Sequence, residues 1–141
     1  MLIFNNLGEM QPYYNKETKT YEFMKDGSRM DVMFEFNFNI NSNILAGDIK
    51  AGDINAGNIN AWDINAEDIT AGAINARDIK AWDINARDIK ARDINALDIN
   101  AEDIQFYAFC CVYGDIKCKS IKGKRENSKY FCLDGKVLIE P

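Results

Sequence analysis

Isoleucine returns every five residues through the middle of this chain. From Ala46 to Gln105 the sequence divides without a gap into twelve pentads, and Ile44 and each later isoleucine are followed two positions on by alanine until Phe106 takes that place. A period of five fits neither the 3.6 of a helix nor the 2 of a long strand, but it allows a three-residue extended side and then a bend. The pattern therefore predicts a β-solenoid over residues 44–121, with Ile and Ala inside and the residue between them outside.

The other two positions of the pentad are a variable residue and, in most pentads, an aspartate. We expect them to form the corner, because Asp and Asn can bond their own backbone in an Asx-turn. Each buried isoleucine contributes about 1.5 to 3 kcal/mol. Since no single pentad could fold alone, stability must be collective.

The pentads resemble those of the pentapeptide-repeat family, and the resemblance covers residues 44–121. It implies an all-β fold, a right-handed quadrilateral β-solenoid that turns once per four pentads. The order of the core residues differs from the usual family motif, in which the small residue stands two before the large one. Here Ala46 precedes Ile49 by three and follows Ile44 by two.

Four pentads per coil would stack residues that are 20 apart, at the ~4.7 to 4.9 Å spacing of neighbouring strands. Trp62 would then lie over Trp82 at one corner. A three-pentad coil would instead put Arg77 over Trp62. The repetition of tryptophan at an interval of 20 favours the four-sided coil.

The segment before the pentads, residues 1–43, is expected to cap the first coil. Strands are predicted at Tyr21–Met24 and Met30–Ile40, around a turn at 25–28. Phe34, Phe36, Phe38 and Ile40 alternate with polar residues, which gives one apolar face. Solenoid ends need such caps because they expose apolar interior and unpaired backbone.

The segment after the pentads, residues 122–141, is expected to close the other end. Residues 130–139, around Asp134 and Gly135, predict a β-hairpin cap. Upstream of it, Cys111 and Cys118 fall in the alanine slot of degenerate pentads. A free cysteine there acts as a small hydrophobe.

Composition indicates one globular domain: 47% of residues are apolar, 28% are charged, and the net charge is −5. An acidic chain has no general attraction for phosphate backbones or anionic membranes. The start lacks a basic segment and no apolar run approaches the ~20 residues of a membrane span. With adjacent Cys110 and Cys111 poorly suited to a disulfide framework, we expect a cytoplasmic location.

The residue inventory argues against catalysis. The chain has no histidine, so it lacks Ser/His/Asp and Cys/His arrangements and imidazole metal ligands. Glycine-rich phosphate loops are absent, and the aspartates do not follow the pattern of calcium-binding rolls. We expect no enzyme activity, no cofactor and no metal.

Binding is the remaining class of function. Large exposed aromatics at the corners often mark contact patches, although they can also simply stack on each other. From Ala46 to Gln105 ten Asp and two Glu face three Lys and three Arg, which makes the rod acidic. The candidate partner-contact residues are Trp62, Trp82, Arg77, Arg87 and Arg92.

Two functions follow as expectations. The first is a non-enzymatic binding or scaffold protein with a protein partner, for which a homodimer is one form. The alternative, implied by the family resemblance, is an acidic DNA mimic that inhibits a nucleic-acid enzyme such as gyrase, encoded by a phage or mobile element. Direct nucleic-acid binding by the basic stretch from Lys117 to Lys129 is not expected, because no base-reading aromatics accompany it.

Overall fold

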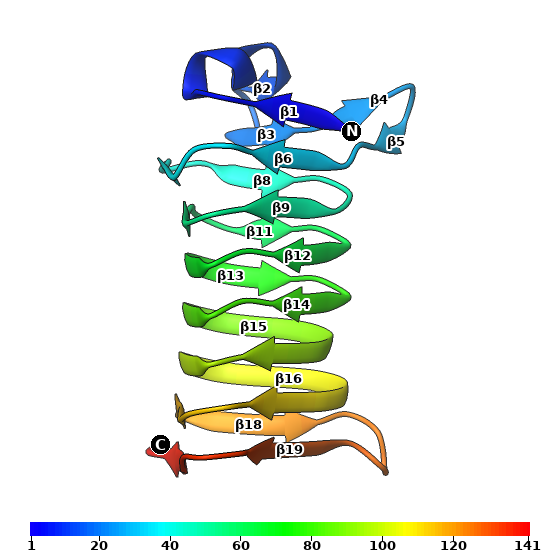
Figure 1. The fold of residues 1–141 in the computed structure, drawn as a ribbon. Helices are drawn as coiled ribbons and strands as arrows, with labels where there is room; N and C mark the ends of the chain where they lie inside the picture. The colour runs from blue at the N-terminus through cyan, green and yellow to red at the C-terminus, as the bar shows by residue number, and fades with distance from the viewer.

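Three parallel β-sheets, one on each side, surround the isoleucine columns. The computed structural model describes residues 1–141, and its coils stack into a rod with the two termini at opposite ends (Figure 1). The chain runs along face 1, then face 2, then face 3 of each coil. Corner 1 precedes face 1, corner 2 precedes face 2, and corner 3 precedes face 3.

Short strands and parts of three long strands make up the faces. Face 1 holds β1 (Leu2–Phe4), β6 (Val32–Phe34), β9 (Ile49–Ala51), β12 (Asp63–Asn65), β14 (Asp78–Lys80), the ends of β15 (Asp83–Ala96) and β16 (Asp98–Val112), and β19 (Lys129–Cys132). Face 2 holds β7 (Phe38–Asn39), β10 (Ile54–Asn55), the starts of β13 (Asp68–Asn75), β15 and β16, β17 (Ile116–Cys118) and β20 (Val137–Ile139). Face 3 holds β3 (Thr20–Glu22), β8 (Asn43–Leu45), β11 (Ile59–Asn60), the end of β13, the middles of β15 and β16, and β18 (Ser120–Gly123).

The register shows that the coil has three pentads, so the four-sided prediction is wrong. Ile64 pairs with Ile49 on one side and with Ile79 on the other, an offset of 15 residues in both directions. Trp62 therefore does not lie over Trp82. The backbone N–H of Arg77 donates to the carbonyl of Trp62 at 2.6 Å, which makes these two the neighbours on successive coils.

Unlike residues stack on successive coils of this solenoid. For this reason the 20-residue interval between the two tryptophans did not indicate the number of residues in a coil. The guanidinium carbon of Arg77 lies 5.6 Å from the Trp62 ring centroid, a cation–π contact. On face 1, Lys50, Asn65, Lys80 and Asn95 alternate along one outward column. Asparagine thus separates the lysines, so that like charges do not meet on adjacent coils.

The core is the one that the Ile-x-Ala period predicts. Every repeat isoleucine from Ile44 to Ile104 is at most 2% exposed, and no buried polar side chain interrupts the columns. Most of the repeat alanines are buried and the others are half-buried. The β-solenoid with an Ile and Ala interior is confirmed.

The aspartates act between coils, not within their own turn as expected. The Oδ1 of Asp31 accepts from the N–H of Asp48 at 2.8 Å, and the Oδ1 of Asp98 accepts from the N–H of Asp115 at 2.8 Å. Asn37 fills the same role toward the N–H of Asp53 at 2.9 Å. The corner residue therefore hydrogen-bonds the next coil, and either Asp or Asn can do so.

The N-terminal end is capped by hairpins and an aromatic cluster. β2 (Tyr14–Asn15) pairs antiparallel with β3, and β4 (Met24–Lys25) pairs antiparallel with β5 (Ser28–Arg29) around Asp26 and Gly27, both at positive φ. The 3₁₀ helix η1 (Leu7–Tyr13) lays Met10 over the core, where Met10 and Phe23 are fully buried. No helix in the chain has the length and apolarity to cross a membrane.

The C-terminal end has no hairpin cap, contrary to expectation. β19 pairs in parallel with β16, and β20 pairs in parallel with β17, so residues after 121 continue the solenoid as a last coil. The hairpin prediction failed because Asp134 and Gly135 lie at a solenoid corner. A corner and a hairpin turn use the same turn residues.

The slots of the cysteines differ in part from the prediction. Cys118 is buried, as expected. Cys111, however, pairs with Asn95 on the outside, while Cys110 takes the isoleucine slot and Val112 the alanine slot. A register shift between Ala91 and Asp93 absorbs one extra residue and moves the pentad frame by one position, and a second extra residue is taken up between Val112 and Ile116.

Candidate functional site

Corner 1 gathers three of the five predicted contact residues. Trp62, Arg77 and Arg92 follow one another on successive coils, joined by the backbone bonds Arg77 N–H to Trp62 carbonyl and Arg92 N–H to Arg77 carbonyl, at 2.6 and 2.7 Å. Arg29 adds a second guanidinium 5.9 Å from the Trp62 centroid. The tryptophan is 41% exposed and already has cationic partners inside the chain.

The arginines of corner 1 also neutralise the aspartates beside them. Arg77 contacts Asp63 at 3.5 Å, and Arg92 contacts Asp78 at 3.0 Å and Asp93 at 3.7 Å. Exposed pairs of this kind add about 0 to 1 kcal/mol each to stability. Their clearer effect is that Asp63, Asp78 and Asp93 each have a guanidinium beside them, whereas Asp31 and Asp48 on the same corner form no ion pair.

Corner 2 has a different character, because large apolar side chains stand on it. Trp82 is 57% exposed, Leu97 44%, Tyr113 54% and Leu133 64%. We call these four residues the apolar ridge. The N–H of Leu97 donates to the Trp82 carbonyl at 2.6 Å, the N–H of Gly114 to the Leu97 carbonyl at 2.6 Å, and the N–H of Asp134 to the Tyr113 carbonyl at 2.7 Å. The ridge residues therefore stand on four successive coils, with Tyr113 and Leu133 each one residue closer to face 1 than the ridge residue before it.

A shallow groove of about 290 Å³ lies along the ridge. The four ridge residues form one wall, and the outward column of face 1 forms the other, with Asn65, Lys80, Asn95 and Cys111. Runs of exposed apolar side chains of this kind often occur at contact surfaces.

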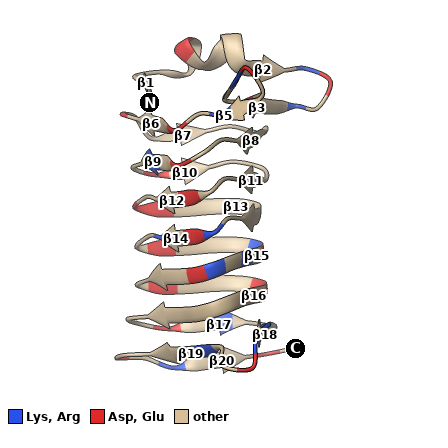
Figure 2. Ribbon diagram, turned by 90° about the vertical axis from the view of Figure 1, so that its right-hand side faces the viewer, with Lys and Arg blue, Asp and Glu red and all other residues tan.

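A column of aspartates flanks the ridge on the side of face 2. Its members are Asp53, Asp68, Asp83, Asp98 and Asp115. None of them takes part in an ion pair, whereas aspartates on the other two corners do. Figure 2 shows acidic positions recurring from coil to coil along the rod. We call this set the unpaired aspartate column.

Burial and neighbouring carboxylates raise the pKa of two of the stacked aspartates. Burial of the carboxylate, followed by the charges of Asp68 and Asp98, raises the pKa of Asp83 above its ordinary value of 3.8. On corner 1, burial and the neighbours Asp31 and Asp63 likewise raise the pKa of Asp48. The stacked carboxylates therefore repel one another in the folded state.

Asp83→Asn should raise the melting temperature at neutral pH, by roughly 1 to 2 °C. Because the folded chain holds the Asp83 proton more tightly than the unfolded chain, this contribution to stability is complete below pH 3.8 and is lost as the pH rises through the higher folded-state pKa. The advantage of the variant should thus grow from acid to neutral pH. Thermal melts at several pH values measure it, and an advantage that shrinks with rising pH would contradict the raised pKa of Asp83.

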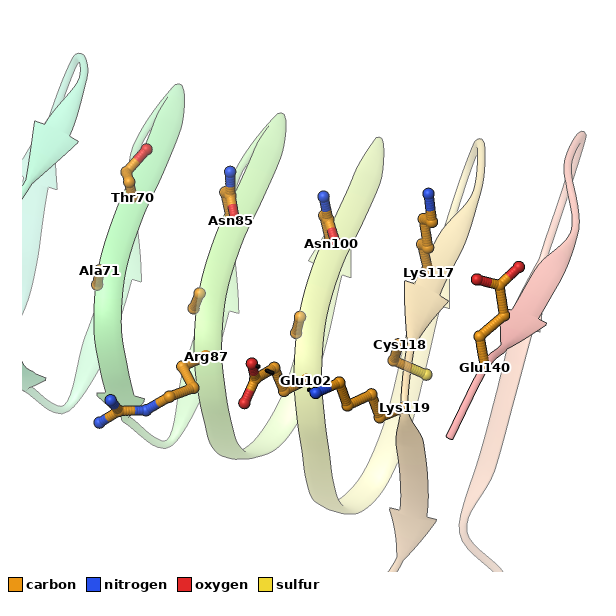
Figure 3. A pocket seen from close by; sticks show the side chains of 12 residues that line it. Thr70, Ala71, Asn85, Arg87, Asn100, Glu102, Lys117, Cys118, Lys119 and Glu140 are labelled. Atoms are coloured by element: carbon orange, nitrogen blue, oxygen red, sulfur yellow. Dashed lines mark ion pairs between the residues drawn. The ribbon is translucent and has the colours of Figure 1, made fainter.

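Corner 3 holds the fifth predicted contact residue, Arg87, beside a groove of about 470 Å³ (Figure 3). Arg87, Glu102 and Lys119 follow one another along it, and Lys119 contacts Glu102 at 3.7 Å. Thr70, Asn85, Asn100 and Lys117 form a second row on face 2 (Figure 3). The charges alternate, so this groove offers no strong field of either sign.

The four cysteines are free thiols. Burial, followed by the charges of Cys132, Cys111 and Cys118, raises the pKa of Cys110 to about 12. Burial also raises the pKa of Cys118 and of Cys132. A thiol whose pKa is raised forms little thiolate, and the thiolate is the nucleophilic form. No group of three or more His, Cys, Asp or Glu residues is placed to hold a metal ion.

The sequence thus identified some of these surfaces and missed others. Trp62, Arg77 and Arg92 come together, but Trp82 and Arg87 stand on the other two corners. Leu97, Tyr113 and Leu133 were missed because a 20-residue coil does not place any of them over Trp82. A period of 15 would have aligned Trp82 with Leu97. The basic stretch ends up on the last coils, where Arg125 lies 6.0 Å from the ring centroid of Tyr107.

Comparison of the chain with protein-family models, curated proteins and solved structures finds no match.

Proposed function

We propose that this chain is a non-enzymatic binding protein that recognises a protein partner through the apolar ridge on corner 2. The observation that carries the proposal is that Trp82, Leu97, Tyr113 and Leu133, all more than two-fifths exposed, stand along one groove on four successive coils. Tryptophan and tyrosine are the residues that most often dominate binding energy at interfaces. The rigid solenoid holds them in a fixed row, so little entropy is lost when a partner docks.

The wider setting of the proposal rests on the five-residue period and on the thiols. We propose that the chain is related to the pentapeptide-repeat family, because it shares the five-residue period and the inward columns. Its three-sided coil differs from the four-sided coil of that family. A cytoplasmic location is proposed from the four free cysteines, because reducing compartments preserve thiols.

The two tryptophans provide a matched pair for testing the ridge. Trp82→Ser should reduce capture of the partner from an extract of the native host by about tenfold or more, since an aromatic anchor is lost. Trp62→Ser removes the same side chain from corner 1 and should leave capture unchanged. Quantitative affinity capture with both variants measures this, and equal retention by Trp82→Ser and the parent chain would overturn the proposal.

A DNA-mimic inhibitor is the second candidate, favoured by the unpaired aspartate column. Duplex DNA carries one negative charge per ~1.7 Å of axis. The pentads from Ala46 to Gln105 carry a net charge of −6 (twelve acidic minus six basic residues), over four coils of about 4.8 Å each, which is about half that density. Competition of the chain with duplex DNA for gyrase separates the candidates, because a mimic must exclude DNA and lose affinity steeply with salt.

A further inference from the structure

We infer that the partner segment bound at corner 2 is a basic amphipathic α-helix, lying along the rod with apolar side chains on the ridge and lysine or arginine beside the unpaired aspartate column. This inference rests on the proposed function and specifies the partner of the same surface. Spacing and charge support it independently.

The spacing of the ridge suits a helix better than a strand. Successive coils are ~4.7 to 4.9 Å apart, so the four ridge residues span about 14 to 15 Å along the rod axis. A helix presents one side chain per 5.4 Å turn on a given face, or about 16 Å over three turns. An extended strand presents one per ~6.7 Å, or about 20 Å over three steps, which loses register with the ridge.

The charge beside the ridge defines one flank of the helix. Asp83 follows Trp82 directly, Asp98 follows Leu97 directly, and Asp115 lies two residues after Tyr113. These carboxylates are exposed and form no ion pair, so each of these three coils offers one negative charge next to one apolar side chain. On the last coil the column ends, because Lys136 takes the position next to Asp115. Lysines or arginines along a helix would meet this row and relieve its repulsion.

The charge on the opposite wall of the groove and on the other two corners differs from the charge on corner 2. The facing wall of the groove is polar, with Lys80 as its one charge between Asn65 and Asn95. Three aspartates of corner 1, namely Asp63, Asp78 and Asp93, already have arginines beside them, and corner 3 alternates in sign. A second copy of this chain placed ridge to ridge would bring two aspartate columns together, which disfavours the homodimer at this surface.

The test uses Trp82 as its own reporter. In a Trp62→Phe background, Trp82 is the only tryptophan, and its emission should shift to the blue when a helix covers it. The probe is a synthetic stapled peptide of about 18 residues, with leucines on one helical face and lysines beside them. Stapling is needed because short helices are marginal in water.

Two control peptides separate the contributions of charge and apolar contact. One replaces the lysines with glutamate and the other replaces the leucines with serine. We expect only the basic amphipathic peptide to bind. Equal binding by the glutamate peptide, or by the serine peptide, would overturn the inference.

Variants of the protein supply the matching control. Asp98→Asn with Asp115→Asn should weaken peptide binding on the order of tenfold. The same changes at Asp78 and Asp93, in the arginine-paired column, should leave binding unchanged. Both pairs should fold, because Asn37, Asn43 and Asn58 already fill this corner role. Equal weakening by the two pairs would contradict the assignment.

Failure of this inference can be told from failure of the proposed function. If Trp82→Ser abolishes capture of the host partner but no basic helix binds, the helix is overturned and the ridge stands. If Trp82→Ser leaves capture unchanged, the ridge itself is overturned as the contact surface, and the inference falls with it.

Discussion

Ile74→Asp is expected to unfold the protein or to destabilise it by more than about 4 kcal/mol. Ile74 is 1% exposed and lies between Ile59 and Ile89 on face 3. A carboxylate at this point would lose its hydration, and no buried polar group is present to receive it. The substitution also removes an apolar side chain that contributes about 1.5 to 3 kcal/mol.

The neighbouring outward position gives the control. Asn75 is exposed on the same strand, so Asn75→Asp adds the same charge one residue away and should change stability by no more than about 0.5 kcal/mol. Chemical denaturation of both variants measures the difference. A melting temperature of Ile74→Asp within a few degrees of the parent would show that the inner column does not hold the rod together.

Phe23→Ala is expected to destabilise the protein by about 3 to 5 kcal/mol. Phe23 is fully buried, and its ring centroid lies 5.2 Å from that of Phe4, 5.4 Å from Tyr13 and 5.7 Å from Phe34. Its removal leaves a cavity under the only capped end of the solenoid. The loss should spread to the first coils, because each coil is stabilised by its neighbours.

Phe109→Ala is the control, because it removes an aromatic side chain that is not buried. It tests whether the destabilisation by Phe23→Ala comes from burial of the ring. Phe109 is 52% exposed, so its removal should cost less than about 1 kcal/mol. Denaturant titration gives both values. Hydrogen exchange of the amides in β6 and β8 should rise in Phe23→Ala, and unchanged exchange there would show that the cap is independent of the coils.

By itself, the sequence determined the β-solenoid and its inner columns. The Ile-x-Ala period has one physical solution, an extended side with both residues inward, and the structure buries every repeat isoleucine accordingly. The inward direction of Phe34, Phe38 and Ile40 was also predicted, but the single strand expected over Met30–Ile40 is divided into β6 on face 1 and β7 on face 2. These features depend on which way a side chain points, and local spacing specifies that.

Only the tertiary structure decided how many sides a coil has. A period of five is compatible with three or four pentads per turn, because the number depends on the angle of each corner and not on the order of apolar and polar residues. That angle set the contacts between coils: Arg77 lies over Trp62, arginines contact aspartates on corner 1, and none contacts an aspartate on corner 2. The apolar ridge exists because a 15-residue coil brings Trp82, Leu97, Tyr113 and Leu133 to one corner, where contacts between distant residues, absent from any local pattern, define the surface.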